Sequence, residues 1–84
     1  MNDKTSDEVI HSALKQFSEE EINTDPILRY FHYTHLPVAL QNISYPFCML
    51  AREIIDTCPR NPERTVALRK LLEAKDAAVR SKVT

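Results

Sequence analysis

Apolar residues recur every three or four positions along most of the chain, which is the spacing that places them on one face of a helix. Near the N-terminus this series consists of Val9, Ile10, Ala13, Leu14 and Phe17. Thr5 and Glu8 precede it at the spacing of a capping box. An amphipathic helix is therefore predicted over residues 6–22. We expect it to fray at its last three glutamates, because negative charge is unfavourable at a helix C-terminus.

A longer apolar series predicts the first helix of a hairpin. Its members are spaced almost as a heptad repeat, and they are Leu36, Leu40, Ile43, Phe47, Leu50, Ile54 and Cys58. Pro46 falls inside this series, but the phase of the pattern is kept across it. We therefore expect a kink or a brief break at Pro46 and no change of direction.

The stretch from Cys58 to Pro62 is expected to end this helix and turn the chain. Asn61 suits a helix N-cap and Pro62 suits the first helical position. A final helix is predicted over 62–82, with one apolar stripe made of Leu68, Leu71, Leu72, Ala78 and Val79. The expected fold class is all-α: a two-helix antiparallel hairpin with an additional N-terminal helix.

Flat rings are concentrated just before the hairpin, where Tyr30, Phe31, His32, Tyr33 and His35 lie within six residues. Their spacing suits either an extended strand or a helical turn, and the pattern leaves both open. Upstream, an Asp-Pro pair at residues 25–26 is a helix-start or turn signal. We divide this single small domain into residues 1–29, an N-terminal amphipathic helix and linker, and residues 30–84, the aromatic segment plus the hairpin.

Composition narrows the possible functions. The 84 residues include no glycine, which excludes glycine-rich phosphate loops. The net charge of -1 combines an acidic half, residues 1–50 with three bases and seven acids, and a basic half, residues 51–84 with eight bases and five acids. This balance fits a phosphate-bearing ligand better than DNA. No apolar run is long enough to span a membrane and the N-terminus is acidic, so we expect a cytoplasmic protein. In that compartment Cys48 and Cys58 are expected to be free, buried thiols.

Two cations fall on the apolar stripe of the final helix. They are Arg64 and Lys75. A desolvated charge without a partner is costly. Either these cations pair with Glu53 and Asp56 of the preceding helix, or they meet an anionic ligand, and the sequence leaves both open. Aromatic rings beside cations are what a nucleotide requires, because rings stack on the base and cations hold the phosphate.

Catalytic and metal-binding chemistry is poorly supported. His32 and His35 have no cysteine or carboxylate at a zinc-site spacing, and Cys48 lies beside the apolar series. We therefore predict a binding protein that is not an enzyme, with no metal, no cofactor and no catalytic residues.

The segments YFHYTHLPVALQ (30–41) and ERTVALRKLLEAKDAAVR (63–80) resemble short phage and prophage proteins. That group is associated with the helical-hairpin domain of phage cyclic-nucleotide sponges, which counter CBASS and Thoeris immunity. The resemblance covers residues 30–82. It implies a small homo-oligomer that binds cyclic dinucleotides, cyclic trinucleotides or a cyclic ADP-ribose type of signal between protomers without cleaving them. The glycine-tyrosine-arginine segment of better-known sponges is absent here, which bears on the identity of the ligand and of its pocket.

Carried onto this chain, the resemblance matches aromatic-segment positions and several positions of the last helix. With the cations of that helix added, the predicted ligand-binding residues are Phe31, Tyr33, His35, Pro37, Arg64, Thr65, Arg69 and Lys75. An alternative of a different class is a structural α-hairpin that mediates protein–protein interaction or oligomerisation and takes no small ligand. Both hypotheses include self-association, because a monomer of this size buries only part of its apolar surface.

Overall fold

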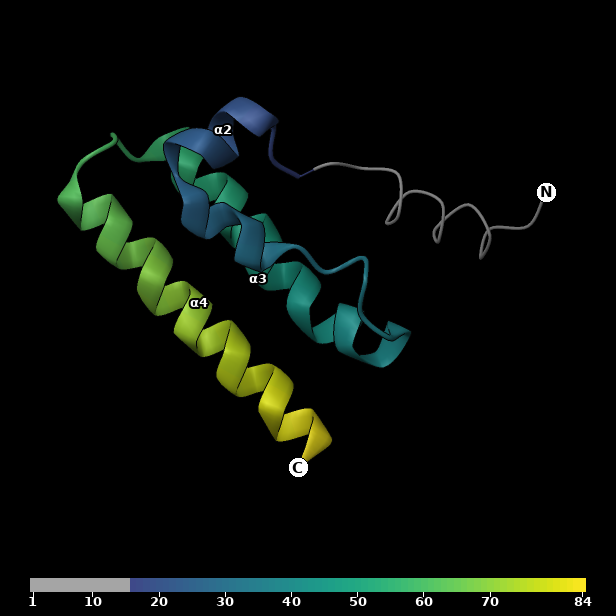
Figure 1. Ribbon diagram of the computed structural model, residues 1–84. Helices are drawn as coiled ribbons and strands as arrows, with labels where there is room; N and C mark the ends of the chain where they lie inside the picture. Colours follow the sequence, from purple (N-terminus) through teal and green to yellow (C-terminus); the bar gives the residue numbers. More distant parts are fainter. Residues whose placement is uncertain (1–15) are drawn as a thin grey trace.

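The computed structural model describes residues 16–84, which fold into helices without any strand among them (Figure 1). The elements are α2 (Glu19–Thr24), the 3₁₀ helix η1 (Pro26–Phe31), α3 (Val38–Thr57) and α4 (Pro62–Val83). The long helices α3 and α4 run antiparallel, and α2 and η1 lie across α3 on one face of the pair. The all-α prediction is confirmed over these residues. None of their helices has the length and apolarity that crossing a bilayer requires.

The first helical region differs from its prediction. Residues 16–18 are not helical, and Ser18 starts the separate short helix α2. The Ser18 hydroxyl accepts the Glu21 amide at 3.1 Å, while the Ser18 amide donates to the Glu21 carboxylate at 2.9 Å. This capping box puts Glu19, Glu20 and Glu21 in a first turn, where the helix dipole favours negative charge. The predicted end of the first helix is therefore wrong, and the predicted helical positions before residue 16 lie outside the described residues.

The aromatic segment begins as a helical turn. Pro26 occupies the first position of η1, as its fixed φ favours, and Leu28 and Phe31 are fully buried. Beyond η1 the Tyr33 ring is also buried and meets Tyr45 of α3 edge-on, with ring centroids 5.4 Å apart. The helical alternative thus applies to residues 26–31, and the chain leaves the helix at His32.

Helix α3 continues through Pro46 without a break, but its buried face differs from the predicted one. The buried residues are Ser44, Cys48 and Ala51, one helical position away from the apolar series. Leu50 of that series is 46% exposed. Cys58 is exposed as well, so the expectation that both cysteines are buried is wrong for Cys58. Small side chains at the buried positions let η1 and α4 approach the α3 backbone closely, and the larger residues are displaced to the side.

The core lies where η1, α3 and α4 meet. It consists of Phe17, Leu28, Phe31, Tyr33, Cys48, Ala51 and Leu68. The last helix begins as predicted, with the Asn61 side chain accepting the Arg64 amide at 2.9 Å and Pro62 in the first turn. Its predicted span of 62–82 is confirmed to within one residue.

Arg52 of α3 fixes the N-terminal part of the described chain. Its guanidinium donates to the Glu21 carboxylate at 2.8 and 2.6 Å, to the Gln16 carbonyl at 2.8 Å, and to Asp56 at 2.6 Å. It also lies over the Phe17 ring, 5.6 Å from the centroid. Hydrogen bonds from Arg52 and from the Ser18 amide lower the pKa of Glu21 to about 2, so this carboxylate stays ionised well into the acid range.

Candidate functional site

A pocket of about 440 Å³ lies between η1, the loop that follows it and α4. We call it the η1–α4 pocket. Its lining residues are Arg29, Tyr30, His32, His35, Leu36, Leu72, Lys75, Asp76, Val79 and Arg80. Its volume falls within the range of small-ligand sites. The pocket therefore brings together two segments that are about forty residues apart in the sequence.

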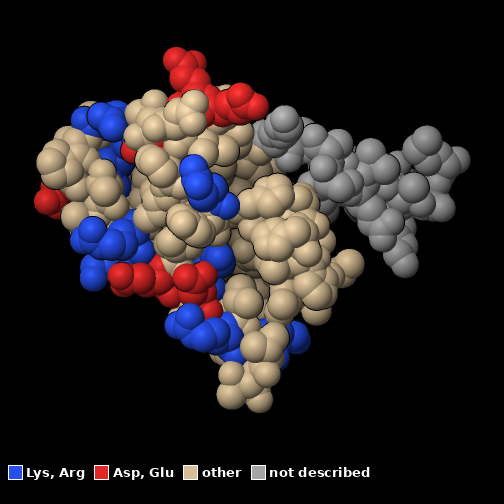
Figure 2. Space-filling model, viewed as in Figure 1, with Lys and Arg blue, Asp and Glu red and all other residues tan. Residues whose placement is uncertain are grey.

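The charged residues of this lining are predominantly cationic. Arg29, Lys75 and Arg80 contribute three positive charges against the single carboxylate of Asp76. The Lys75 side chain is only 12% exposed, and its ammonium lies 2.9 Å from Asp76 Oδ1. On the visible face Lys and Arg side chains follow α4 with acids interspersed among them (Figure 2). The excess of positive charge in a concave site favours an anion.

Flat rings stand at the same pocket. Tyr30 is 60% exposed, which is unusual for a large ring in a small domain. The His32 and His35 rings are stacked in parallel, 5.4 Å between centroids and 6° between planes. The His32 Nε2 lies 2.9 Å from the Thr34 hydroxyl, which holds that ring in place. These accessible rings offer stacking surfaces next to cations, the combination that suits a nucleobase attached to a phosphate.

The predicted ligand-binding residues are divided among different environments. His35 and Lys75 line the η1–α4 pocket. Phe31 and Tyr33 are instead buried in the core, with 0% and 1% of their surface exposed. Burial raises the pKa of the Tyr33 hydroxyl above its usual value. Two of the four aromatic-segment positions, Phe31 and Tyr33, are thus packing residues in this fold, and the accessible ring that replaces them is Tyr30.

Three further predicted residues are exposed and lie outside the η1–α4 pocket. Pro37 occupies the N-cap position of α3, and Thr65 and Arg69 lie on the outer surface of α4. The structure does not bring these three together with His35 and Lys75.

Arg64 is buried and paired with an acid that the sequence pattern did not indicate. Its Nη2 lies 2.6 Å from Asp25 Oδ2, at the junction of α2 and η1, and 8% of its side chain is exposed. Its Nη1 also reaches the carbonyls of Ile55 and Cys58, each at 3.4 Å. Of the two alternatives, this arrangement matches structural pairing, although neither expected acid is the partner: Asp25 takes the place of Glu53 and Asp56.

Sequence reasoning missed five charged or ring-bearing lining residues of the pocket: Arg29, Tyr30, His32, Asp76 and Arg80. The four-residue spacing of Asp76 and Arg80 is typical of a solvated ion pair along a helix, but in the structure Asp76 pairs with Lys75. The Asp-Pro pair at residues 25–26 indicates a helix start, and this signal could have shown which way Arg29 and Tyr30 point. A helical turn from residue 26 buries Leu28 and Phe31 and turns the two residues between them outward.

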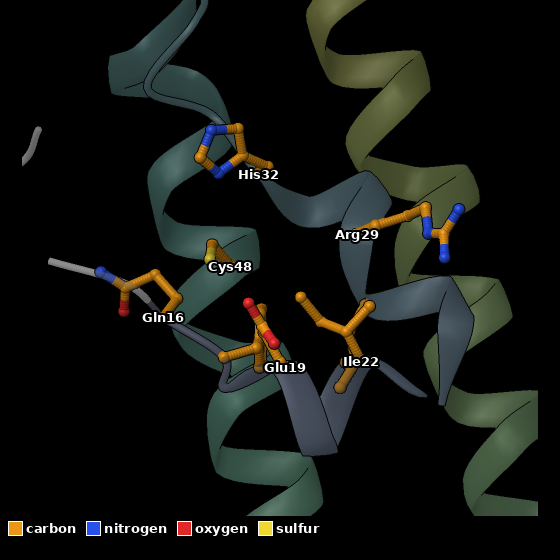
Figure 3. Close-up of a pocket in the computed structure, with 8 residues that line it drawn as sticks. Gln16, Glu19, Ile22, Arg29, His32 and Cys48 are labelled. Carbon is orange, nitrogen blue, oxygen red and sulfur yellow. The ribbon is translucent and has the colours of Figure 1, made fainter. Parts of the chain in front are cut away.

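A second pocket, of about 400 Å³, lies on the other side of η1 (Figure 3). Its floor is apolar and includes Phe17, Ile22, Leu28 and Cys48. Burial raises the pKa of the Cys48 thiol to about 12, so the thiol stays protonated and is a poor nucleophile near neutral pH. Figure 3 shows the Arg29 side chain extending away from Cys48 toward α4. Arg29 and His32 nevertheless line both pockets.

Within residues 16–84 no cluster of three or more histidine, cysteine or acidic side chains is arranged to hold a metal ion. Comparisons with protein-family models, curated proteins and solved structures find no match to this chain.

The buried Asp25–Arg64 pair generates a stability prediction. Arg64→Ala leaves the Asp25 carboxylate largely buried without its close partner, so the free energy of unfolding should fall by about 3–5 kcal/mol. Arg60→Ala is the matched control, because Arg60 lies 3.9 Å from the same carboxylate and its side chain is 64% exposed. Its loss should stay below about 1 kcal/mol. Urea unfolding of both variants measures the difference, and similar losses would show that the buried pair has no special role.

Proposed function

We propose that this protein is a phage anti-defence protein that binds and sequesters a cyclic oligonucleotide signal at the η1–α4 pocket without cleaving it. The observation that carries the proposal is the meeting of exposed rings and cations at one pocket of about 440 Å³. The resemblance of residues 30–41 and 63–80 to cyclic-nucleotide sponges points to the same chemistry. Both segments contribute to the lining: the first through Tyr30, His32, His35 and Leu36, and the second through Leu72, Lys75, Asp76, Val79 and Arg80.

Each group has a role in such binding. Lys75, Arg80 and Arg29 supply charge-assisted hydrogen bonds to phosphate oxygens. Tyr30 and His35 supply faces on which a base stacks, a contact worth about 1–3 kcal/mol per base. Sequestration requires only binding, so the ligand leaves the protein chemically unchanged.

Binding is tested with a panel of cyclic dinucleotides, cyclic trinucleotides and cyclic ADP-ribose isomers. A true ligand at 100 times its dissociation constant should stabilise the protein by about 2.7 kcal/mol in thermal melting. Lys75→Ala should weaken that ligand by about 10- to 150-fold in calorimetry, because a hydrogen bond to a charged group is lost.

Lys70→Ala is the control for this variant, since Lys70 is on α4, is 68% exposed and lies outside the pocket. It should bind the ligand as the unmodified protein does. Ligand released by denaturing the complex should have its original mass. A panel in which no compound shifts the melting temperature would contradict the proposal.

A second candidate function, an interaction module, is favoured by the face of the α3–α4 pair opposite η1. Arg52 of α3 reaches toward α2, so the stripe on the other side of the buried residues points away from α2. That stripe carries Ile43, Phe47, Leu50 and Ile54. The corresponding stripe of α4 carries Ala67, Leu71, Ala74 and Ala78, all exposed or half-buried. We call these eight residues the outer apolar face.

The outer apolar face suits a second copy of the same chain. Large side chains lie on one helix and mostly alanines on the other, so a two-fold rotation places the bulky stripe of each copy against the small stripe of its partner. No member of the face is charged. Self-association by this face leaves the η1–α4 pocket, on the other side of the hairpin, accessible. Homo-oligomerisation and ligand binding are therefore compatible.

Self-association is tested by light scattering at micromolar concentration. The unmodified chain should have the mass of a dimer or a larger assembly. Leu50→Glu should reduce that mass to a monomer, because it places a charge in the middle of the outer apolar face, while circular dichroism keeps its helical signal. Val38→Glu is the control, because Val38 is 66% exposed on the same helix but outside the face, and its mass should not change. A monomeric unmodified protein would contradict self-association.

A further inference from the structure

Asp76 is the one acid among the lining residues of the η1–α4 pocket. Its carboxylate opposes the binding of phosphate, so its presence in an otherwise cationic pocket needs a reason. Pairing with the Lys75 ammonium supplies part of that reason, because the Lys75 side chain is only 12% exposed. That pairing leaves 46% of the Asp76 side chain exposed at the pocket.

The contacts of Asp76 leave it able to accept more hydrogen bonds. Oδ1 lies 2.9 Å from the Lys75 ammonium, and 46% of the Asp76 side chain is exposed. An ionised carboxylate accepts hydrogen bonds at both oxygens and donates none. A phosphate entering the pocket competes with Asp76 for the Lys75 ammonium. As Lys75 turns to the phosphate, both oxygens of Asp76 are available to the rest of the ligand.

We infer that Asp76 selects a guanine base in the bound ligand, an inference that rests on the proposed nucleotide binding. The Watson–Crick edge of guanine presents two adjacent donors, its ring N1–H and its exocyclic N2–H₂, which match the two oxygens of one carboxylate. Adenine has an acceptor lone pair on N1 beside its amino group, and cytosine has one on N3 beside its own. A carboxylate repels either lone pair. Asp76 therefore discriminates between bases, whereas Arg29, Lys75 and Arg80 bind any phosphate.

Calorimetry with cyclic diguanylate and cyclic diadenylate tests this inference on the full chain. The unmodified protein should bind cyclic diguanylate about 5- to 150-fold more tightly, the range expected for one bidentate contact to a base edge. Asp76→Asn keeps the shape of the side chain but replaces one acceptor with a donor. It should remove most of the preference by weakening the guanine ligand, and it should tighten the adenine ligand because a negative charge near the phosphates is removed.

Glu73→Gln is the matched control, because Glu73 is an exposed acid on α4 that lies outside the pocket. It should leave both affinities unchanged. If the unmodified protein binds the two nucleotides equally, or if Asp76→Asn changes both affinities by the same factor, Asp76 does not read the base and the proposed function still stands. If neither nucleotide binds, the guanine inference is overturned, and the wider ligand panel then decides the proposed function separately.

Discussion

The ion pair between Asp25 and Arg64 joins the α2–η1 junction to the start of α4, two parts of the fold that lie far apart in the sequence. Asp25 ends α2 and precedes η1, and Arg64 lies in the first turn of α4, so the 2.6 Å contact spans thirty-nine residues. The same guanidinium reaches carbonyls at the end of α3 and in the turn beyond it. A buried charge that loses its partner is costly, so η1 is held against the start of α4. The pocket formed between η1 and α4 depends on that placement.

The distribution of charge follows from this arrangement. Because Arg64 is neutralised inside the structure by Asp25, the positive charge available to a ligand comes from residues farther along α4 and from η1. Lys75 and Arg80 face Arg29 across the η1–α4 pocket. The α2–η1 layer covers one face of the α3–α4 pair, and the outer apolar face remains on the other. We propose different partners for the two faces, a small anion on one and a protein surface on the other.

The features that were predicted correctly from the sequence are those that local interactions determine. The all-α class and the helix start at Asn61 follow from capping chemistry and apolar spacing, and they agree with the structure. A kink or a brief break was expected at Pro46, and the structure shows one helix without a break there. The predicted buried face of α3 is one residue out of register with the observed one, because the pattern counts large apolar residues and ignores small ones. Ser44 and Ala51 are buried because their size permits close packing, which depends on neighbours distant in the sequence.

The candidate site was harder to predict, for the same reason. Sequence reasoning identified His35 and Lys75 but could not pair Arg64 with Asp25, which lies thirty-nine residues away. It also favoured Phe31 over Tyr30 as a stacking ring. That choice depends on which side of a single helical turn faces the core, and the aromatic pattern alone left helix and strand open. Long-range pairing and the orientation of a short turn are properties of the assembled fold.

The most direct test of the central claim, that the η1–α4 pocket is where a nucleotide binds, is an amide NMR titration of the full chain with cyclic diguanylate. If the nucleotide binds in this pocket, the largest shifts should occur at Arg29, Tyr30, His35 and residues 75–80. Residues 43–54, which carry the outer apolar face, and Thr65 and Arg69 should change little. Shifts centred on the outer apolar face, or on Phe17 and Cys48 in the second pocket, would contradict the account.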